Sequence, residues 1–300
     1  MKKLFSLILL AMLVFSLAAC GQKDNKASEG KKDTTSTKEV FKIGAIPDQN
    51  AAFLDSGMTA MAKYLSEKTG LKVEFVPSVD YAALVTGFQR GEINMAWFGG
   101  LTSVQARNLV PDAESIAQRP NDAEFHSVFI TQANSGINKL DDVKGKSFTF
   151  GSESSTSGHL MPRYYLMEAG IDPLKDFDGK PNFSGSHDTT YKLIESGAFK
   201  AGALNESVWK AAVKDGKVDS NKVKVFYTTP SFYDYNWTIN SNVEDVFGKG
   251  TKTKVKDALL SFKGEQKEIS DLFQTDKFIE TKNDNYKKIE KVAKKLKIIK

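Results

Sequence analysis

Apolar, β-rich runs alternate along most of the chain with stretches whose apolar residues recur at helical spacing. The first run stops at Pro47, and the first helical stretch stops at Gly70, a residue that often caps the C-terminus of a helix. Strands that alternate with helices of about ten to fifteen residues predict an α/β fold with mainly parallel sheets. The expected strands include 40–47, 71–78, 93–100 and 146–152, and the expected helices include 53–70, 80–91 and 158–170.

The second half of the chain repeats the order of the first. In both 80–100 and 188–207 an acid opens a helix, a glycine closes it, a strand follows and a small or polar turn ends the unit. The extended aromatic stretches 126–134 and 222–240 flank the second half and are interpreted as two crossovers between two α/β lobes. Two lobes joined by two strands are suited to hinge around a ligand cleft. The predicted lobes are 40–127 plus 236–300, and 128–235.

The N-terminus is typical of an exported protein. Lys2 and Lys3 precede an apolar run, 4–17, that is too short to span a bilayer comfortably and ends in small residues. The small residues before Cys20 resemble a bacterial lipoprotein signal, although an ordinary signal peptide with a chance cysteine is the alternative. The prediction is a signal peptide, 1–19, and a lipid-anchored flexible tether, 20–39, which would hold the protein at the outer face of the cytoplasmic membrane.

The net charge of the chain says little about its partners. The formal net charge is +5, but acids and bases are interspersed along the chain. Nucleic acid is therefore not an expected partner, whereas a mild attraction for anions is expected. The last helical pattern carries lysines opposite one apolar face. Packing of that face on the protein is favoured over a membrane-surface helix. The apolar face consists of Tyr286, Ile289, Val292, Ala293 and Leu296.

Five hydroxyl side chains crowd into the segment 152–157, directly before an apolar run. Proline is tolerated only in the first turn of a helix, so Pro162 predicts a helix that starts near 156–159. The unpaired N–H groups and the dipole of such a start favour anions, and Ser155, Thr156 and Ser157 add donors. Gly158 is expected to let a ligand approach the backbone. A single N-cap serine is the plainer alternative.

Four segments together resemble the phosphonate-binding family of ABC-transporter solute receptors, which also takes phosphite and phosphate-like oxyanions. They are "SSTSGHLMPRYYL" (154–166), "VDYAALVTGFQRGEINMAWFGG" (79–100), "GSHDTTYKLIESG" (185–197) and "GALN" (202–205). The resemblance covers most of 40–240. It implies a two-lobed periplasmic-binding-protein fold (type II, Venus-flytrap) with two crossover strands, a small tetrahedral oxyanion as ligand, and no cofactor. It also implies delivery of the ligand to a membrane permease with a cytoplasmic ATPase.

The resemblance assigns ligand contacts residue by residue. Tyr81 matches the family tyrosine that reaches the ligand from the first lobe, and His187 matches the histidine opposite the hydroxyl loop. Trp97 and Phe98 match an aromatic wall, and Asn205 lies near an acidic or amide position of the family. His159 is expected on the helix surface. Tyr233, Asp234 and Tyr235 lie in the second crossover, where they either gate the site or pack between the lobes.

The identity of the anion stays open. "SSTSGHLMPR" together with "FYDYNWT" (232–238) is most similar to a branch of the family assigned to selenate. Phosphate, phosphite and phosphonate monoanions carry a proton that a buried carboxylate can accept, whereas sulfate and selenate carry none and would be repelled. The candidate carboxylates are Asp48, Glu153, Asp188 and Asp234. A small organic ligand, or ferric iron held by Tyr233 and Tyr235, is a further alternative.

Enzymatic readings are weaker. A hydrolase or transferase could use the serine-rich helix start, but no complete catalytic motif surrounds Ser155. The three histidines, His126, His159 and His187, lack metal-ligand spacing, and Cys20 has no second cysteine. We therefore expect no catalytic residues and no metal.

Overall fold

The computed structural model describes residues 39–300, which belong to one compact unit running from Lys38 to Lys300. The predicted signal peptide and Cys20, with the tether up to residue 38, lie outside the described residues. Among the described helices, none combines the length and the apolar character needed to cross a bilayer.

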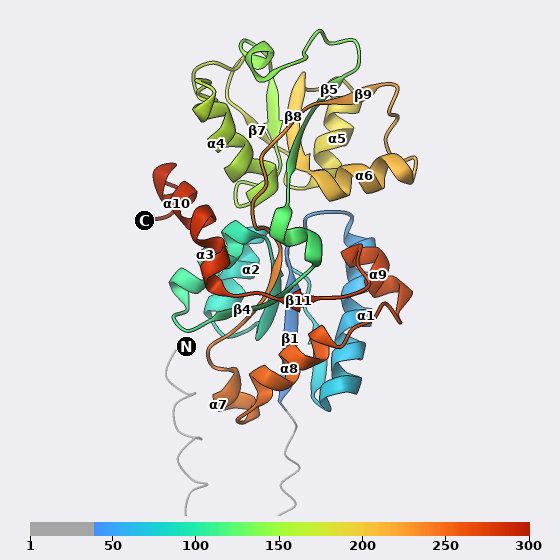
Figure 1. Cartoon of the computed structure of the whole chain (residues 1–300), viewed down its shortest axis with the longest axis vertical. Coiled ribbons are helices and arrows are strands. Elements are labelled where there is room, and N and C mark those ends of the chain that lie inside the picture. Colours follow the sequence, from blue (N-terminus) through green and yellow to red (C-terminus); the bar gives the residue numbers. More distant parts are fainter. Residues whose placement is uncertain (1–38) are drawn as a thin grey trace, which may run out of the picture. The chain divides into compact units, whose positions relative to one another are not determined.

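The first sheet has six strands in the order β11-β4-β10-β3-β1-β2. β1 pairs in parallel with β2 and β3, as the βαβ pattern predicts, whereas β10 runs antiparallel to both β3 and β4. Figure 1 shows these strands with helices packed around them. The strands are β1 (Val40–Ala45), β2 (Lys72–Phe75), β3 (Met95–Phe98), β4 (Glu114–Gln118), β10 (Asn236–Ile239) and β11 (Ile279–Glu280).

The second sheet has five strands in the order β7-β6-β8-β5-β9. β6 is parallel to β7 and β8, and β5 is antiparallel to β8 and β9. Side chains along β5 alternate between two separate apolar clusters, since Val128 and Ile130 belong to one and Phe129 to the other. The strands are β5 (Ser127–Gln132), β6 (Phe148–Phe150), β7 (Asn182–Phe183), β8 (Ala201–Asn205) and β9 (Val223–Thr228).

Both sheets are mixed rather than mainly parallel, and the crossovers give the reason. β5 follows β4 of the first sheet, and β10 follows β9 of the second, so each enters its sheet from the neighbouring sheet and runs against the strands beside it. Between the two sheets the crossover chains pair through a single antiparallel bridge, Phe125 with Phe232. The two segments that connect the sheets therefore lie side by side at this bridge.

Local signals in the sequence account for the helix ends. Asn50 caps α1 by accepting the N–H of Phe53 at 3.1 Å, and Gly70 ends it in the left-handed conformation at φ 71°. Asp80 caps α2 by accepting the N–H of Ala83 at 2.7 Å. The α-helices are α1 (Ala51–Thr69), α2 (Tyr81–Gln89), α3 (Gly100–Leu109), α4 (Met161–Glu168), α5 (His187–Glu195), α6 (Glu206–Lys214), α7 (Val243–Phe247), α8 (Thr251–Leu260), α9 (Lys267–Phe273) and α10 (Lys287–Lys295). The short 3₁₀ segments are η1 (Pro120–Glu124), η2 (Leu140–Val143) and η4 (Asn283–Tyr286).

The C-terminal helix packs on the protein, as predicted. The side chains of Ile289, Val292 and Ala293 on α10 are buried in the large core around the first sheet. Leu160 and Met161, which directly follow the hydroxyl loop, belong to the same core. The second-sheet segment that carries the hydroxyls is thus anchored in the first-sheet core.

Candidate functional site

The hydroxyl loop opens a helix, as Pro162 predicts. A π-helical turn, η3 (Thr156–Leu160), leads directly into α4, and the Oγ of Ser155 caps it by accepting the N–H of Gly158 at 2.9 Å. Pro162 lies in the first turn of α4, where its missing N–H is tolerated. The side chains of residues 155–157 are all buried.

Gly158 is closely surrounded by protein atoms. A Cβ at this position would lie 2.9 Å from Ser155 Oγ, 3.1 Å from Gly151 Cα and 3.1 Å from His187 Cε1. Protein atoms therefore occupy the space next to Gly158, and glycine is needed there for close packing of the helix start. The geometry does not support an open approach for a ligand.

A second helix start meets the hydroxyl loop. At the N-terminus of α3 the N–H of Gly100 donates to Asp234 Oδ1, and the N–H of Leu101 donates to Thr156 Oγ1, both at 2.9 Å. A Cβ on Gly99 would lie 3.2 Å from Thr156 Oγ1 and 3.3 Å from Asp234 Oδ1. The double glycine at the end of β3 thus allows a carboxyl and a hydroxyl to reach the helix N–H groups.

Three buried polar atoms around this junction have no hydrogen-bond partner among the described residues. They are the hydroxyls of Tyr81 and Ser157 and the second carboxyl oxygen, Oδ2, of Asp234. A buried polar atom without a partner costs about 1–3 kcal/mol, so such atoms are rare in native proteins. Two donors and one acceptor left in one region are suited to a ligand that both accepts and donates hydrogen bonds.

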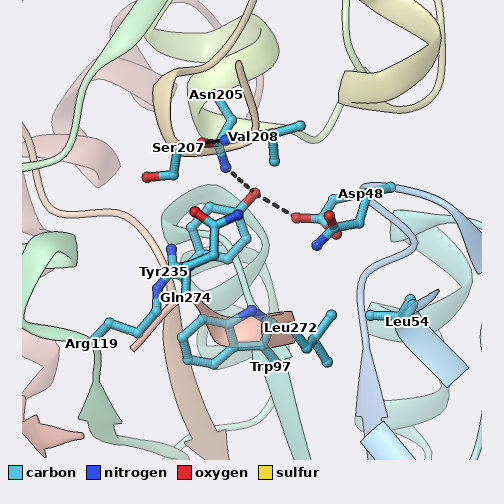
Figure 2. A pocket seen from close by; sticks show the side chains of 11 residues that line it. Asp48, Leu54, Trp97, Arg119, Asn205, Ser207, Val208, Tyr235, Leu272 and Gln274 are labelled. Atoms are coloured by element: carbon cyan, nitrogen blue, oxygen red, sulfur yellow. Dashed lines mark hydrogen bonds between the residues drawn. The ribbon is translucent and has the colours of Figure 1, made fainter. Parts of the chain in front are cut away.

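A hydrogen-bond network is centred on the Tyr235 hydroxyl, whose bonds to Asp48 and Asn205 Figure 2 shows. The Tyr235 hydroxyl donates to Asp48 Oδ2 at 2.7 Å, accepts from Asn205 Nδ2 at 3.0 Å, and lies 3.3 Å from His187 Nε2. The N–H of His187 donates to the carbonyl of Asp48 at 2.9 Å. Asn205 also caps α6 by accepting the N–H of Val208 at 3.0 Å. The network joins first-sheet and second-sheet segments through the crossover residue Tyr235.

A small cavity of about 10 Å³ lies beside this network, enough for about one water molecule. Trp97 stacks on Tyr235 with ring centres 5.6 Å apart, and the Arg119 guanidinium lies 4.9 Å from the Tyr235 ring centre. The hydroxyl loop does not line this cavity, so the cavity borders the polar cluster without containing it. The lining residues are Asp48, Gln49, Leu54, Trp97, Arg119, Asn205, Ser207, Val208, Tyr235, Leu272 and Gln274.

Comparison with known proteins gives the family. The family model described as "ABC transporter, phosphonate, periplasmic substrate-binding protein" matches residues 43–286. This chain belongs to that family. It is therefore a periplasmic-type substrate-binding protein of an ABC transporter, with a small-molecule ligand and a permease as partners, and the predicted two-lobed fold is confirmed.

Relatives in this family bind related anions according to their names. The probable ABC transporter phosphite binding protein PhnD1 of Prochlorococcus marinus (strain MIT 9301) is 42% identical over 271 residues, 87% of this chain and 91% of the relative. Its structure in complex with methylphosphonate, at 41% identity, covers 87% of this chain and 99% of that one with a TM-score of 0.84. The phosphate-import protein PhnD of Mycolicibacterium smegmatis is 29% identical over 230 residues, 71% of this chain and 72% of the relative.

Burial raises the pKa of Asp48, in the Tyr235 network, and of Asp234, next to the hydroxyl loop. The pKa of Asp48 rises to about 6, although the Tyr235 hydroxyl and the Arg119 charge favour its anion. The pKa of Asp234 rises to about 7, against the N–H of Gly100 and the nearby hydroxyls of Thr156 and Ser157. The Ser157 hydroxyl favours the Asp234 anion by proximity, since its geometry does not make a hydrogen bond. Near neutral pH both acids can exchange protons.

His187 is neutral at pH 7, because burial lowers its pKa to about 4. Its Nδ1 accepts the N–H of Asn205 at 3.4 Å, so the proton is assigned to Nε2, which faces the Tyr235 hydroxyl. The ring contributes no positive charge to the site.

The structure brings most of the predicted site residues together and separates two of them. The Phe98 ring packs on Phe88 at 5.5 Å in the core, and the Tyr233 ring packs on Tyr286 at 5.9 Å, so neither is part of the cluster. Adjacent strand residues point to opposite faces, which explains why Trp97 faces the cavity and Phe98 does not. The residues gathered around the junction, the network and the cavity are Tyr81, Trp97, Ser155, Thr156, Ser157, His187 and Asn205.

His159 is not a surface residue. Its ring is buried between Phe150 and Phe183, at 5.0 and 4.9 Å, and its Nδ1 lies 2.7 Å from the carbonyl of Glu153. It therefore supports the far side of the hydroxyl loop. Glu153 itself is exposed.

Sequence reasoning missed Arg119 altogether and left Asp48, Asp234 and Tyr235 without a definite role. The signal for Arg119 was available: an arginine and an aspartate three residues apart, around Pro120, stand directly before the first crossover. The signal for Asp48 was weaker, because an acid after a strand and before a helix also reads as an ordinary cap.

The raised pKa values predict how stability without ligand varies with pH. The folded chain keeps protons on Asp48 and Asp234 that the unfolded chain releases near pH 4, so the free energy of unfolding should fall between about pH 4 and 7 and then level off. Asp234→Asn should flatten this dependence and raise stability at pH 8 by up to roughly 4 kcal/mol. Urea unfolding of both proteins from pH 4 to 8 measures it. Parallel curves for the two proteins would contradict the raised pKa of Asp234.

Proposed function

We propose that this substrate-binding protein captures a small tetrahedral oxyanion that carries a proton, of the phosphite, phosphonate or phosphate type, and delivers it to its permease. The observation that carries the proposal is the trio of buried atoms without partners, Tyr81 Oη, Ser157 Oγ and Asp234 Oδ2. Two hydroxyls can donate to anionic oxygens, and a carboxylate can accept a ligand O–H. The names of the relatives, which refer to phosphite, phosphate and methylphosphonate, support the same class.

The carboxyl of Asp234 supports this class over selenate and sulfate. A fully ionised tetrahedral dianion has no proton to donate, so it would meet a buried carboxylate with repulsion and leave it unpaired, at a cost of several kcal/mol. Alternatively Asp234 takes up the proton itself, which its pKa of about 7 allows. In both cases one proton lies between the acid and the anion.

We assign the remaining contacts by their place in the cluster. Ser155 and Thr156 hold the helix start in position and can add hydrogen-bond donors. His187 orients the Tyr235 hydroxyl through its Nε2. Trp97 forms the wall of the small cavity where a ligand substituent would point. The proposed ligand contacts are Tyr81, Ser155, Thr156, Ser157, His187, Asp234 and Tyr235, with Asn205 acting through Tyr235.

The lobe boundaries and the absence of catalysis are parts of the same proposal. The lobes 40–127 plus 236–300, and 128–235, are supported by β5 and β10, which pair in different sheets. A hydrolase is disfavoured because the Ser155 oxygen accepts a backbone N–H, while both nitrogens of His187 face other partners. Ferric iron is disfavoured because the Tyr235 hydroxyl is already bonded to Asp48 and Asn205, while the Tyr233 ring packs on Tyr286.

A ligand panel tests the proposed function. Calorimetry at pH 7 should detect binding of phosphite, methylphosphonate or phosphate and little binding of sulfate or selenate. Affinity should fall by roughly tenfold per pH unit once Asp234 and the ligand have both lost the shared proton. In Asp234→Asn this pH dependence should vanish and sulfate should gain affinity relative to phosphite. Wild-type binding of sulfate or selenate alone would reject the proposal.

Ser157 tests the cluster itself. Ser157→Ala removes one donor to a charged ligand, worth about 1.5–3 kcal/mol, so the Kd should rise about tenfold to a hundredfold. Ser154→Ala is the matched control in the same loop, because the partly exposed Ser154 lies outside the cluster. Equal effects of the two substitutions would argue against a role for Ser157 in the site.

We also propose that Cys20, the single cysteine of the chain, carries the lipid that holds the receptor at the outer face of the membrane. Cys20→Ser should move the protein from the membrane fraction to the soluble exported fraction, because a tether without acyl chains has no stable anchor. Ligand affinity should be unchanged. Retention of the variant in washed membranes would contradict lipidation at this residue.

A further inference from the structure

A buried ion pair lies beneath the proposed site. Arg119 and Asp122, the two ends of one short turn, are 5% and 0% exposed, and the pair is bidentate, with Nε–Oδ2 at 2.8 Å and Nη2–Oδ1 at 2.6 Å. Burial works to lower the pKa of Arg119, but the Asp122 carboxylate outweighs it and holds that pKa above its usual value. The pair is therefore ionised, with Asp122 fully buried and Arg119 nearly so.

The pair holds the crossover that carries Asp234 and Tyr235. The N–H of Asp234 donates to the carbonyl of Asp122 at 3.0 Å. The guanidinium of Arg119 lies 4.9 Å from the ring centre of Tyr235 and 5.3 Å from that of Trp97, within the range of cation–π attraction. Figure 2 shows Arg119 beside Tyr235 and Trp97 on the cavity wall. Arg119 and Asp122, which follow β4, thus hold Asp234 and Tyr235 of the second crossover in place.

The pair also extends this support to the C-terminal part of the first-sheet core. Nη1 of Arg119 donates to the carbonyl of Phe273, at the end of α9, at 3.1 Å. Just beyond the pair, Phe125 and Phe232 exchange two backbone hydrogen bonds of 2.9 Å where the two crossovers run side by side. One guanidinium therefore contacts the turn before the first crossover, Tyr235 in the second crossover, and the end of α9.

Fold stability alone is a poor reason for such a pair. The desolvation of two buried charges consumes most of their attraction, and well-packed apolar residues of similar size are often equally stable or more stable. An aromatic or aliphatic filling would also pack beneath Trp97. What an apolar filling cannot do is hold the Tyr235 ring by a fixed charge and fix the turn from Arg119 to Asp122 by a bidentate bond. That turn carries the backbone carbonyl of Asp122, which accepts the N–H of Asp234.

We propose that Arg119 and Asp122 are positioning residues for the oxyanion site: the pair sets where the Tyr235 hydroxyl and the Asp234 carboxyl lie, and so tunes affinity without contacting the ligand. This proposal rests on the proposed function. It predicts that ligand affinity depends on the pair through Tyr235. It also predicts that a positive charge at residue 119 without the bidentate geometry is not sufficient for full affinity.

The test replaces the whole pair, so that no buried charge is left alone. Arg119→Met with Asp122→Leu should retain the fold in thermal unfolding and weaken phosphite or methylphosphonate binding at least tenfold. Arg119→Lys, a milder second variant, keeps the charge but loses the bidentate geometry and should weaken binding in the same direction. Arg107→Met is the matched control, because Arg107 stacks on Tyr286 at 5.6 Å and does not line the cavity.

A double-mutant cycle with Tyr235→Phe separates positioning from general support. If the pair acts through the Tyr235 hydroxyl, the losses of affinity should be clearly less than multiplicative when both changes are combined. Binding within threefold of wild type in the pair variant, or fully multiplicative losses, would overturn the proposal. The same cycle is measured by urea unfolding without ligand. It reports the coupling of the pair to Tyr235 even if wild type bound none of the oxyanions, a result that would reject the proposed function instead.

Discussion

A buried carboxyl at the start of a helix is the constraint on which the site depends. Asp234 leaves water and accepts the N–H of Gly100 at 2.9 Å, at the positive end of the α3 dipole. Its other oxygen has no partner among the described residues, and burial keeps the pKa of the acid near 7. A carboxyl in this state favours any neighbour that can supply a proton. The chemistry of the site begins with that requirement.

The fold supplies the carboxyl and the hydroxyls from opposite directions. Asp234 and Tyr235 arrive on the second crossover, just before β10 enters the first sheet, whereas Ser155–Ser157 belong to a helix of the second sheet. Leu160 and Met161 hold that helix start in the first-sheet core, and the bond from Leu101 N–H to Thr156 Oγ1 fixes its approach. Apolar packing and the bond to the Thr156 hydroxyl thus set the geometry, so the hydroxyls of Tyr81 and Ser157, which have no partner among the described residues, need not hold the lobes together.

The sequence predicted the fold and part of the site because both leave local signals. Helix caps such as Asp80 and Gly70, and a proline that must lie in a first turn, are readable without coordinates. The direction of β5 and β10 is not local, because it depends on which sheet each strand joins after a crossover. The pairing of Arg119 with Asp122 leaves a local signal, but its role does not, since that role depends on Trp97, Tyr235 and Phe273, which are far from it in sequence. Phe98 and Tyr233 lie outside the cluster, because their rings pack on Phe88 and Tyr286.

The balance of buried charges restricts the choice of ligand more than any single contact does. Around the cluster lie the acids Asp48, Asp122 and Asp234 and one buried cation, Arg119, while His187 is neutral. Arg119 is already paired to Asp122, so an anion entering the site finds no free positive charge there. Two unprotonated acids beside a dianion would concentrate negative charge in a region of low dielectric, which is strongly unfavourable. The arrangement is favourable only when protons accompany the anion, either on Asp48 and Asp234 or on the ligand itself. A receptor with the proposed contacts would select for the proton as much as for the tetrahedral shape, and the hydroxyls of Tyr81 and Ser157 would supply hydrogen bonds in place of a lysine or arginine.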